Sequence, residues 1–511
     1  FTLIMILIAG VIGSLIAVFS LGYMEAFQKE YRDVRDRRNF FFFVLFLFLS
    51  AMFGLVVSNN LLYMYTFWET TSVCSFLLIG YTESRVAVNN SFKALWMNLL
   101  GGAAFAAAII VMGLTYHSTA LSHLVGLALA GMPVTVILAL LLLCGFTKSA
   151  MMPFSGWLLG AMVAPTPTSA LLHSSTMVKA GVFLIIKLCP ALGNNHAGTM
   201  AMFIGGITFF FASCAAISQS DGKKVLAYST ISNLGLIVCC AGIGSYEAAW
   251  TAIMIVIFHA VAKSLLFLSV GTAEQQLGSR DIERFDGLFN AMPHLCLCMV
   301  IGISGMFLAP FGMLISKWAA MKAFIDAGHP MLLLLLVFGS ATTIFYWAKW
   351  LGKILSVMNG QERREQGITK GEWFTLKTLS WMTIIVCILF PLISNYGVLP
   401  YLRITYGFTR DVIAQSNLII MSLMVVLLVI LPSRYGKGQP KRKVGALLAG
   451  VNMGDDRNYH GAGDNIIPVE LRNWYMEEWF GERKMKLSGF ALCMACIFIQ
   501  FAIILGGVYR G

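Results

Sequence analysis

Residues 144–187 form an apolar stretch that nevertheless contains side chains able to bind and release protons. Lys148, His173 and Lys179 lie within it. Three prolines interrupt it: Pro153, Pro165 and Pro167. A lysine at bilayer depth costs about 2.5–3.5 kcal/mol on insertion scales, and prolines free backbone carbonyls that only protein or cavity water can satisfy. The combination predicts a polar path through a membrane, although any single lysine could instead extend its ammonium to the headgroups.

Glu69 is the natural partner for Lys148. It lies in the middle of the apolar stretch 61–80, where a lone carboxylate is either protonated or paired. If the two groups attract each other and are then separated, the lysine releases its proton more readily, because burial disfavours the charged form. The pair is therefore a candidate proton relay.

His259 and Lys263 are spaced i, i+4 within IMIVIFHAVAKSLLFL, which places both on one face of a helix. Histidine titrates near neutrality, so this pair could carry protons through bridging waters. The alternative is a structural histidine packed in a helix bundle.

Lys317 follows a second predicted helix break, at Pro310 and Gly312. The first break, at Pro153, instead follows its lysine, Lys148. The chain thus has two similar halves: a broken helix with Lys148 and a histidine-bearing helix, then His259 with Lys263 and a broken helix with Lys317. This order predicts two repeats of inverted topology, an arrangement common in transporters.

Three further lysines lie near predicted helix ends. Lys223 either anchors a basic loop at the membrane surface or serves at a proton entrance, and the sequence leaves both alternatives open. Lys349 and Lys353 are predicted to extend their side chains to the headgroups.

The composition identifies a polytopic membrane protein. Of 511 residues, 58% are hydrophobic and only 12% are charged, against about a quarter in soluble domains. The net charge of +12 reflects basic loops and predicts no nucleic-acid partner. The chain begins inside an apolar run, so we expect that N-terminal sequence is missing.

Fourteen apolar stretches are long enough to cross a bilayer, and all are predicted to be helices. They are 3–22, 40–57, 61–80, 92–114, 133–151, 168–188, 200–217, 225–243, 249–270, 293–315, 331–353, 375–396, 416–432 and 487–507.

Basic residues gather in alternate loops, which predicts the orientation. One side receives Lys29, Arg32, Arg35, Arg37, Arg38, Arg85, Lys223, Lys224, Arg280, Arg284, Arg363, Arg364 and the run from Arg434 to Lys443. On the other side only Arg403 and Arg410 stand out. The basic side is predicted to be cytoplasmic, which leaves both ends of this chain on the opposite face of the cytoplasmic membrane.

Residues 433–486 form the only long polar stretch. Its glycines argue against one long helix, and we expect an ordered cytoplasmic loop that ends in a short amphipathic helix. It either docks a partner or is a solvated loop.

Cys493 and Cys496 lie within an apolar predicted helix. They are therefore not expected to hold a metal ion or an iron–sulfur cluster.

Four long motifs resemble the antiporter-like subunits of respiratory complex I, of multisubunit cation/proton antiporters and of energy-converting membrane hydrogenases. These motifs are FWETTSVCSFLLIGY (67–81), GFTKSAMMPFSGWLLGAMVAPTPTSALLHSSTMVKAGVFLI (145–185), KKVLAYSTISNLG (223–235) and FHAVAKSLLFLSVG (258–271). The resemblance covers roughly residues 1–350. It implies an all-α fold with fourteen core helices and two inverted five-helix units containing broken helices. The first two core helices would precede this chain, and its last two helices would lie beyond the core.

The resemblance also assigns residues by position. Glu69 matches the channel glutamate and Lys148 its partner lysine. Lys263 matches the central lysine, and Lys317 the lysine of the second broken helix. The remaining matches are His173 and His259 on the connecting axis and Lys223 in a D-x-K-R/K-V-L-A-Y motif.

The chain departs from this pattern in four places. Leu99 and Gly102 stand where the most similar complex I subunit has an Arg and an Asp, which puts a salt-bridge gate there in doubt. Lys179 replaces an uncharged residue. The segment 433–486 is too short and glycine-rich for a long lateral helix, and VGALLAGVNMGDDRNYHGAGDN (444–465) resembles hydrogenase-type members.

The sequence therefore predicts a proton-translocating subunit in the membrane arm of a complex I-like oxidoreductase, most like an energy-converting [NiFe] hydrogenase. The alternative is a Na⁺/H⁺ antiporter subunit without redox chemistry. Residues 1–400 would form the antiporter-like core and 401–511 a C-terminal extension. No cofactor is expected in this chain. Expected partners are other membrane-arm subunits and a peripheral arm that holds iron–sulfur clusters and a NiFe centre.

Overall fold

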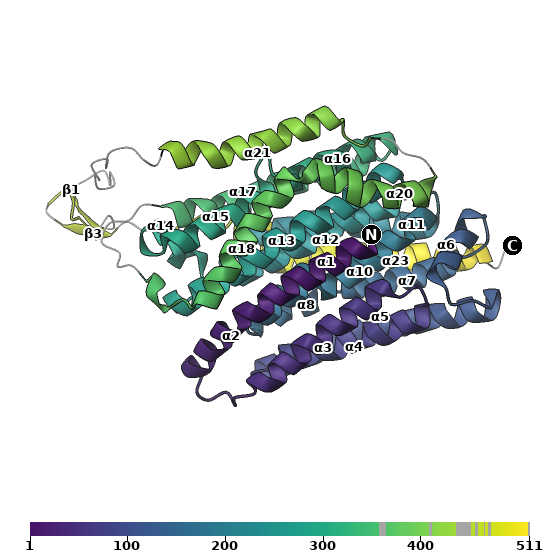
Figure 1. The fold of residues 1–511 in the computed structure, drawn as a ribbon, viewed down its shortest axis with the longest axis horizontal. Coiled ribbons are helices and arrows are strands. Elements are labelled where there is room, and N and C mark those ends of the chain that lie inside the picture. Colours follow the sequence, from purple (N-terminus) through teal and green to yellow (C-terminus); the bar gives the residue numbers. More distant parts are fainter. Residues whose placement is uncertain are drawn as a thin grey trace.

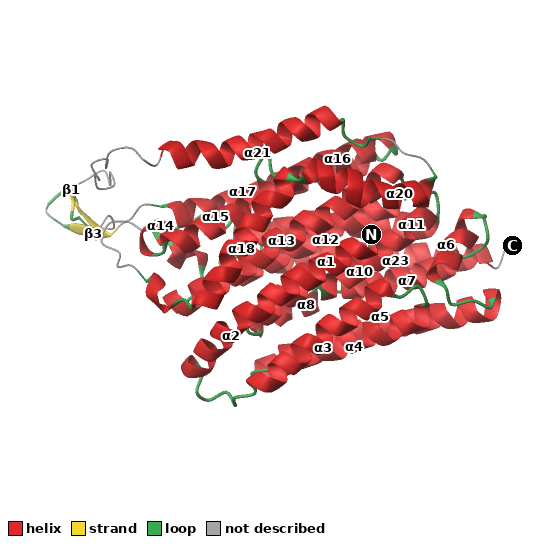
Figure 2. Ribbon diagram, in the orientation of Figure 1, coloured by secondary structure: helices red, strands yellow, loops and turns green. Residues whose placement is uncertain are grey.

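The computed structural model describes residues 1–356, 364–407, 411–435, 451–454, 458–463, 465–468 and 472–508. Almost all of them are helical, apart from one small sheet (Figure 2). The side chains of the basic run from Arg434 to Lys443, and residues Arg363 and Arg410, lie outside this description. The orientation that they helped to predict remains a prediction.

The N-terminal part of the chain contains ten α-helices and three shorter helical turns. They are α1 (Thr2–Leu7), η1 (Ile8–Ile12), α2 (Gly13–Glu30), α3 (Arg38–Val57), α4 (Leu61–Ile79), α5 (Arg85–Tyr116), α6 (Leu121–Leu129), α7 (Thr135–Lys148), α8 (Gly156–Gly160), η2 (Ala161–Val163), α9 (Thr166–Ala170), η3 (Leu171–Ser175) and α10 (Met177–Leu188).

The middle of the chain continues with long helices. They are η4 (Cys189–Ala191), α11 (His196–Ile217), α12 (Gly222–Ile243), α13 (Tyr246–Leu277), η5 (Ile282–Phe285), α14 (Leu288–Ala291), α15 (Pro293–Phe307), α16 (Gly312–Asp326) and α17 (Pro330–Leu355).

The C-terminal part mixes helices with three short strands. Its elements are η6 (Glu365–Gly367), α18 (Lys370–Ile388), α19 (Phe390–Leu392), η7 (Ile393–Val398), α20 (Leu399–Tyr406), α21 (Gln415–Tyr435), β1 (Val451–Asn452), β2 (Asn458–His460), β3 (Ile466–Pro468), α22 (Glu477–Phe480) and α23 (Glu482–Val508). The predicted division at residue 400 falls within α20 and remains a prediction.

The protein is a polytopic helical membrane protein, as the sequence predicts, but the count of fourteen spans is not confirmed. Within the described part of the chain, ten helices are long and apolar enough to cross a membrane, or eleven if one bent pair is a single span. The other three predicted stretches coincide with α4, which carries Glu69, and with the shorter apolar helices Thr135–Lys148 and Gln415–Leu428.

The central helices are buried over their whole circumference. In Figure 1, α12 and α13 lie in the middle of the bundle, between α3 and α4 at one edge and α21 at the other. Every residue of the apolar windows in α12, α13 and the span Thr166–Ala191 is buried. A helix that is apolar all round belongs in such a core, and polar side chains within it must find partners among neighbouring helices.

Local sequence sets the ends of these central helices. The Asp221 side chain accepts the Lys224 N–H and caps α12, whose other end is Gly244 at φ +76°. The Ser245 side chain caps α13, which ends at Gly278 with φ +66°. Glycine adopts this left-handed conformation without steric cost. Both ends of the 32-residue helix α13 are therefore set by single residues of the local sequence, Ser245 and Gly278.

Two helix breaks lie where the prolines predict them. Helix α7 ends at Lys148, and α8 begins only at Gly156. The second break separates α15 from α16, and Lys317 follows it. Lys148 thus precedes the first break and Lys317 follows the second.

The stretch predicted as one helix at 375–396 is instead bent. The segments Lys370–Ile388 and Phe390–Tyr406 meet at 66°. Pro391 lies in the first turn after the bend, where its missing N–H and its ring prevent the preceding helix from continuing.

The C-terminal polar segment differs from its prediction. Strands β1, β2 and β3 form an antiparallel sheet, which the sequence analysis did not foresee, and the short helix α22 has only four residues. Glu283 anchors the segment to the bundle by accepting hydrogen bonds from the Tyr475 hydroxyl at 2.5 Å and the Asn473 N–H at 3.2 Å.

The prediction that Lys349 and Lys353 reach toward the headgroups is wrong. Lys353 is 7% exposed and pairs with Glu283 at 2.8 Å and Asp286 at 3.2 Å. Lys349 donates to the Ile217 carbonyl at 2.6 Å and lies 3.9 Å from the centre of the Tyr475 ring. Both ammonium groups turn inward because carbonyls and carboxylates of neighbouring loops are within reach.

Glu283→Gln is expected to loosen the attachment of the C-terminal segment. Burial raises the pKa of Glu283, but hydrogen bonds from Lys353, Tyr475 and Asn473 outweigh it and hold the pKa below the ordinary 4.5. The anchoring is therefore complete above pH 4.5 and is lost as the pH falls through the depressed value. In limited proteolysis at neutral pH, the C-terminal polar segment of the Glu283→Gln variant should be cut about tenfold faster than that of the parent protein. Glu478→Gln changes an exposed residue and should be cut at the parent's rate. Equal cleavage of both variants would contradict this anchor.

Candidate functional site

Lys263 lies at the centre of the bundle on α13 and is completely buried. Its Nζ donates to the Leu226 carbonyl at 3.1 Å and to the Ser229 hydroxyl, both on α12. The ammonium also stands 5.0 Å from the centre of the Trp347 ring of α17. These contacts solvate a cation at mid-membrane depth with a hydroxyl, a carbonyl and an aromatic face.

His259, one turn earlier on α13, contacts a different lysine from the one that the spacing suggests. Its Nδ1 lies 3.0 Å from Nζ of Lys179 on α10, and both side chains are completely buried. Nε2 of His259 has no hydrogen-bond partner in the described part of the chain. Lys179, which the family resemblance marked as a departure, therefore belongs to the same polar cluster.

His173 occupies the π-helix η3, directly after the proline-rich start of α9. It is completely buried, and neither ring nitrogen has a partner among the described residues. The ring lies between Trp157 and Phe267, at centroid distances of 6.4 and 5.6 Å. π-Helical turns are frequent at functional sites, and this one directs a titratable ring into the core.

Two hydroxyl groups link the histidine-bearing turn to α13. The Ser264 hydroxyl, next to Lys263, lies 2.7 Å from the Ser174 hydroxyl, next to His173. This contact joins the elements that carry His173 and Lys263 through groups that both donate and accept protons.

Lys148 contacts the helix that carries Glu69 without forming an ion pair within 4.0 Å of its carboxylate. Its Nζ donates to the Ser72 hydroxyl at 2.7 Å and to the Trp68 carbonyl at 2.9 Å, on either side of Glu69 in α4. A Cβ at Gly102 of α5 would press against Glu69 Oε1. The position that holds an aspartate in the similar complex I subunit therefore faces the glutamate directly, and here it is a glycine.

Lys317 is on α16 and is 6% exposed. Its Nζ stands 5.6 Å from the centre of the Phe209 ring of α11. Like Lys148 and Lys263, it meets an aromatic face, and it lies in the half of the bundle that contains the second helix break.

Several completely buried hydroxyls beside these groups have no partner in the described structure. They are Thr168, Ser169, Ser175 and Ser269. Buried polar atoms are nearly always hydrogen-bonded to protein or water, and a water needs two to four polar neighbours. The hydroxyls of α9, η3 and α13, together with the ring nitrogens of His173, provide the lining that a chain of internal waters requires.

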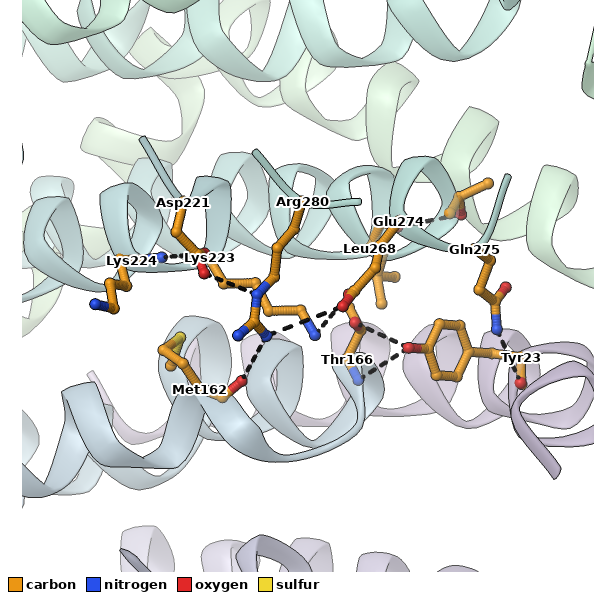
Figure 3. Close-up of polar contacts among 11 residues, drawn as sticks. Tyr23, Met162, Thr166, Asp221, Lys223, Lys224, Leu268, Glu274, Gln275 and Arg280 are labelled. Atoms are coloured by element: carbon orange, nitrogen blue, oxygen red, sulfur yellow. Dashed lines mark hydrogen bonds and ion pairs between the residues drawn. The ribbon is translucent and has the colours of Figure 1, made fainter. Parts of the chain in front are cut away.

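Lys223 belongs to a charged cluster at the end of the bundle (Figure 3). Its ammonium is 3% exposed and lies 2.8 Å from a Glu274 carboxylate oxygen. Arg280 pairs with Asp221 at 2.7 Å and also approaches Glu274, at 3.9 Å. An antiparallel bridge between Asp221 and Asp281 holds the two loops together.

Sequence reasoning missed the partners of the predicted residues. Ser72 and Ser229 contact the buried lysines, and Glu274 neutralises Lys223. The two serines are common residues in apolar stretches, and their role follows from a contact with another helix. Glu274 alone carried a signal, because it is the acid nearest the end of α13, about three turns after Lys263.

The chain can be placed in a family by its match to known sequences. Residues 58–343 match the family described as NADH:quinone oxidoreductase/Mrp antiporter, transmembrane, and this range is more than half of the chain. The chain belongs to this family. The family region contains every predicted site residue from Glu69 to Lys317.

Curated relatives of this chain include Na(+)/H(+) antiporter subunits. The Na(+)/H(+) antiporter subunit A1 of Staphylococcus aureus strain Newman is 32% identical over 421 residues, which are 77% of this chain and 51% of the relative. The protein of strain MRSA252 is 33% identical over the same length. The chain thus spans about half the length of the curated relatives it matches.

Two solved structures share the fold of this family member. The Mrp complex from Dietzia sp. DQ12-45-1b aligns with a TM-score of 0.71 and 26% identity, over 85% of this chain and 49% of the other. The membrane-bound sulfane sulfur reductase, an archaeal respiratory membrane complex, aligns with a TM-score of 0.69 and 22% identity, over 83% of this chain and 84% of the other. The second likeness concerns the fold alone.

Proposed function

We propose that this antiporter-type membrane subunit translocates protons along a cluster formed by the half-buried Glu69 and the buried Lys148, His173, Lys179, His259, Lys263 and Lys317. One observation carries the proposal. Lys148, Lys179 and Lys263 are completely buried, and no described carboxylate lies within ion-pair distance of any of them. Uncompensated buried cations are costly, so packing alone gives no reason to keep three of them.

The contact between Lys179 and His259 gives this cluster a way to move protons. At 3.0 Å, the two groups cannot both be cations without strong repulsion, so at most one of them is charged at a time. Arrival of a proton on one side therefore favours release on the other. Hydroxyls at Ser264 and Ser174, with internal water, extend the connection toward Lys263 and His173.

The first candidate for the driving reaction is exchange with another cation, as a subunit of a multisubunit Na⁺/H⁺ antiporter. The 32% identity to an antiporter subunit A1 over 421 residues supports it. In this candidate the subunit performs no redox chemistry, and its partners are other membrane subunits.

The second candidate is electron transfer in partner subunits, as in an energy-converting [NiFe] hydrogenase. The resemblance of residues 444–465 to hydrogenase-type members supports it, and so does the complex I branch of the family. This chain would hold no cofactor. A peripheral arm would bind iron–sulfur clusters and a NiFe centre, and the whole complex would be an oxidoreductase.

Purification of the complex with its native partners separates the two candidates. An antiporter is expected to contain membrane subunits alone and to acidify vesicles in response to a sodium gradient. A hydrogenase-type complex is expected to contain nickel and iron and to move protons only when an electron donor is supplied. If neither a sodium gradient nor an electron donor moves protons, the proposed translocation is wrong.

We also propose that the basic face is cytoplasmic, in the cytoplasmic membrane, and that both ends of this chain lie on the other side. Met453→Cys, an exposed position in the C-terminal segment, should react with an impermeant thiol reagent only from the cytoplasmic side. A reporter fused after Gly511 should be active only outside. A cytoplasmic reporter would mean that the number of spans is wrong by an odd number.

A further inference from the structure

A pocket of about 530 Å³ opens at the end of the bundle where Lys223 lies. Its lining combines charged side chains from α2, α12 and α13, which are Glu30, Lys223 and Glu274, with Arg280 from the loop after α13. We call this pocket the vestibule. Its inner wall is formed by Tyr23 and by the residues that lead into α9, up to Pro165.

Tyr23 is a buried residue of the vestibule lining. The side chain is 3% exposed, and its hydroxyl donates to Thr166 Oγ1 at 3.1 Å and accepts the Thr166 N–H at 3.5 Å (Figure 3). The Gln275 amide donates to the Tyr23 carbonyl at 3.2 Å. Tyr23 on α2 is therefore tied both to the first residue of α9 and to the end of α13.

Unpartnered polar groups begin directly behind this contact. Thr168 and Ser169 follow Thr166 in α9, and His173 lies seven residues beyond it, about 10 Å along a helix. All of these groups are completely buried and lack partners among the described residues.

We propose that the vestibule is the inlet by which protons from the basic face reach His173 and the buried lysines, and that Tyr23 is the plug between the vestibule and the internal polar column. The inference rests on the proposed proton translocation, because it supplies the path with an entrance. The paired charges of Lys223, Glu274 and Arg280 keep the vestibule hydrated. The Tyr23 ring then separates the water of the vestibule from the internal waters near His173. Displacement of the ring would connect these two bodies of water.

The plug can be tested by cysteine accessibility in the complete complex, in inverted membrane vesicles. Ser169→Cys places a thiol behind the plug, and the probe is a small charged methanethiosulfonate reagent added at the basic face. In the parent background this thiol should be nearly unreactive. Tyr23→Ala should speed its labelling about tenfold, since it removes the ring and a buried hydrogen bond.

Three controls make the outcome specific. Val34→Cys, in the outer vestibule, should react equally in all backgrounds. Tyr31→Ala removes an exposed tyrosine from the same pocket and should leave Ser169→Cys unreactive. The chain without an added cysteine measures the native thiols, of which ten are buried and Cys496 is partly exposed.

The proposal is overturned if Tyr23→Ala leaves labelling of Ser169→Cys unchanged, or if Tyr31→Ala increases it as much. If Tyr23→Ala does not assemble, Tyr23→Phe removes only the hydroxyl and should speed labelling about threefold; no change would equally overturn the proposal. Labelling requires no pumping, so these results can be read even if the subunit proves not to translocate protons.

Discussion

Replacing Lys263 with alanine is expected to abolish coupled proton transport while the complex still assembles. Lys263 is the central buried cation, and among the described residues it is solvated by two groups of α12 and by the Trp347 ring. A positioned proton-transfer group typically contributes a factor of about 10²–10⁴ to a rate, so transport should fall at least about a hundredfold. Assembly should survive because the change removes an uncompensated buried charge and creates none.

Proton uptake by vesicles containing the purified complex measures this effect, with subunit content checked on the same sample. Lys263→Met, which keeps the volume of the side chain, should lose transport equally, and this separates the missing ammonium from the cavity left by alanine. Lys322→Ala is the matched control, because the side chain of that lysine is 43% exposed and pairs with Asp326 at 3.4 Å on the same helix. Assembled Lys263→Ala complex with unchanged proton uptake would remove Lys263 from the path.

Glu69 and Lys148 are expected to act as one unit. Glu69→Gln removes the carboxylate that α4 carries between the two groups to which Lys148 donates, the Trp68 carbonyl and the Ser72 hydroxyl, and Lys148→Met removes the ammonium itself. Either change should lower proton transport by about tenfold or more. The double variant should assemble about as well as either single one, because no lone charge remains buried, and it should transport no worse than the poorer of them.

A double-mutant cycle on proton translocation in reconstituted complex tests this coupling. Glu83→Gln is a suitable control, because Glu83 is exposed and pairs with Arg37 at 2.7 Å at the bundle surface. When Glu83→Gln is combined with Lys148→Met, the factors by which the two changes lower the transport rate should simply multiply. If the factors by which the Glu69 and Lys148 substitutions lower the transport rate also simply multiply, the two residues do not form a switch. The hydrogen bond from Lys148 to the Ser72 hydroxyl would then have no role in coupling them.

Much of the fold follows from local features of the sequence. Apolar length predicts helices that coincide with all fourteen stretches, even though only ten or eleven of the described helices meet the criteria for a span. Prolines at 153 and 310 predict both breaks, because the loss of an N–H and the steric demand of the ring act within one turn. The small sheet at 451–468 was missed, since strands of two or three residues leave no periodic pattern to detect.

The sequence by itself determined which residues are candidates for proton transfer, because an ionisable side chain in an apolar stretch is conspicuous wherever it lies. Tertiary structure decided their partners. Helices α12 and α13 are buried all round, so their apolar pattern does not say which side faces which neighbour. His259 therefore contacts Lys179, eighty residues away, rather than Lys263. Lys223 likewise meets Glu274, and Tyr23 meets Thr166. These contacts depend on the rotation and packing of helices distant in the chain, which no local pattern records.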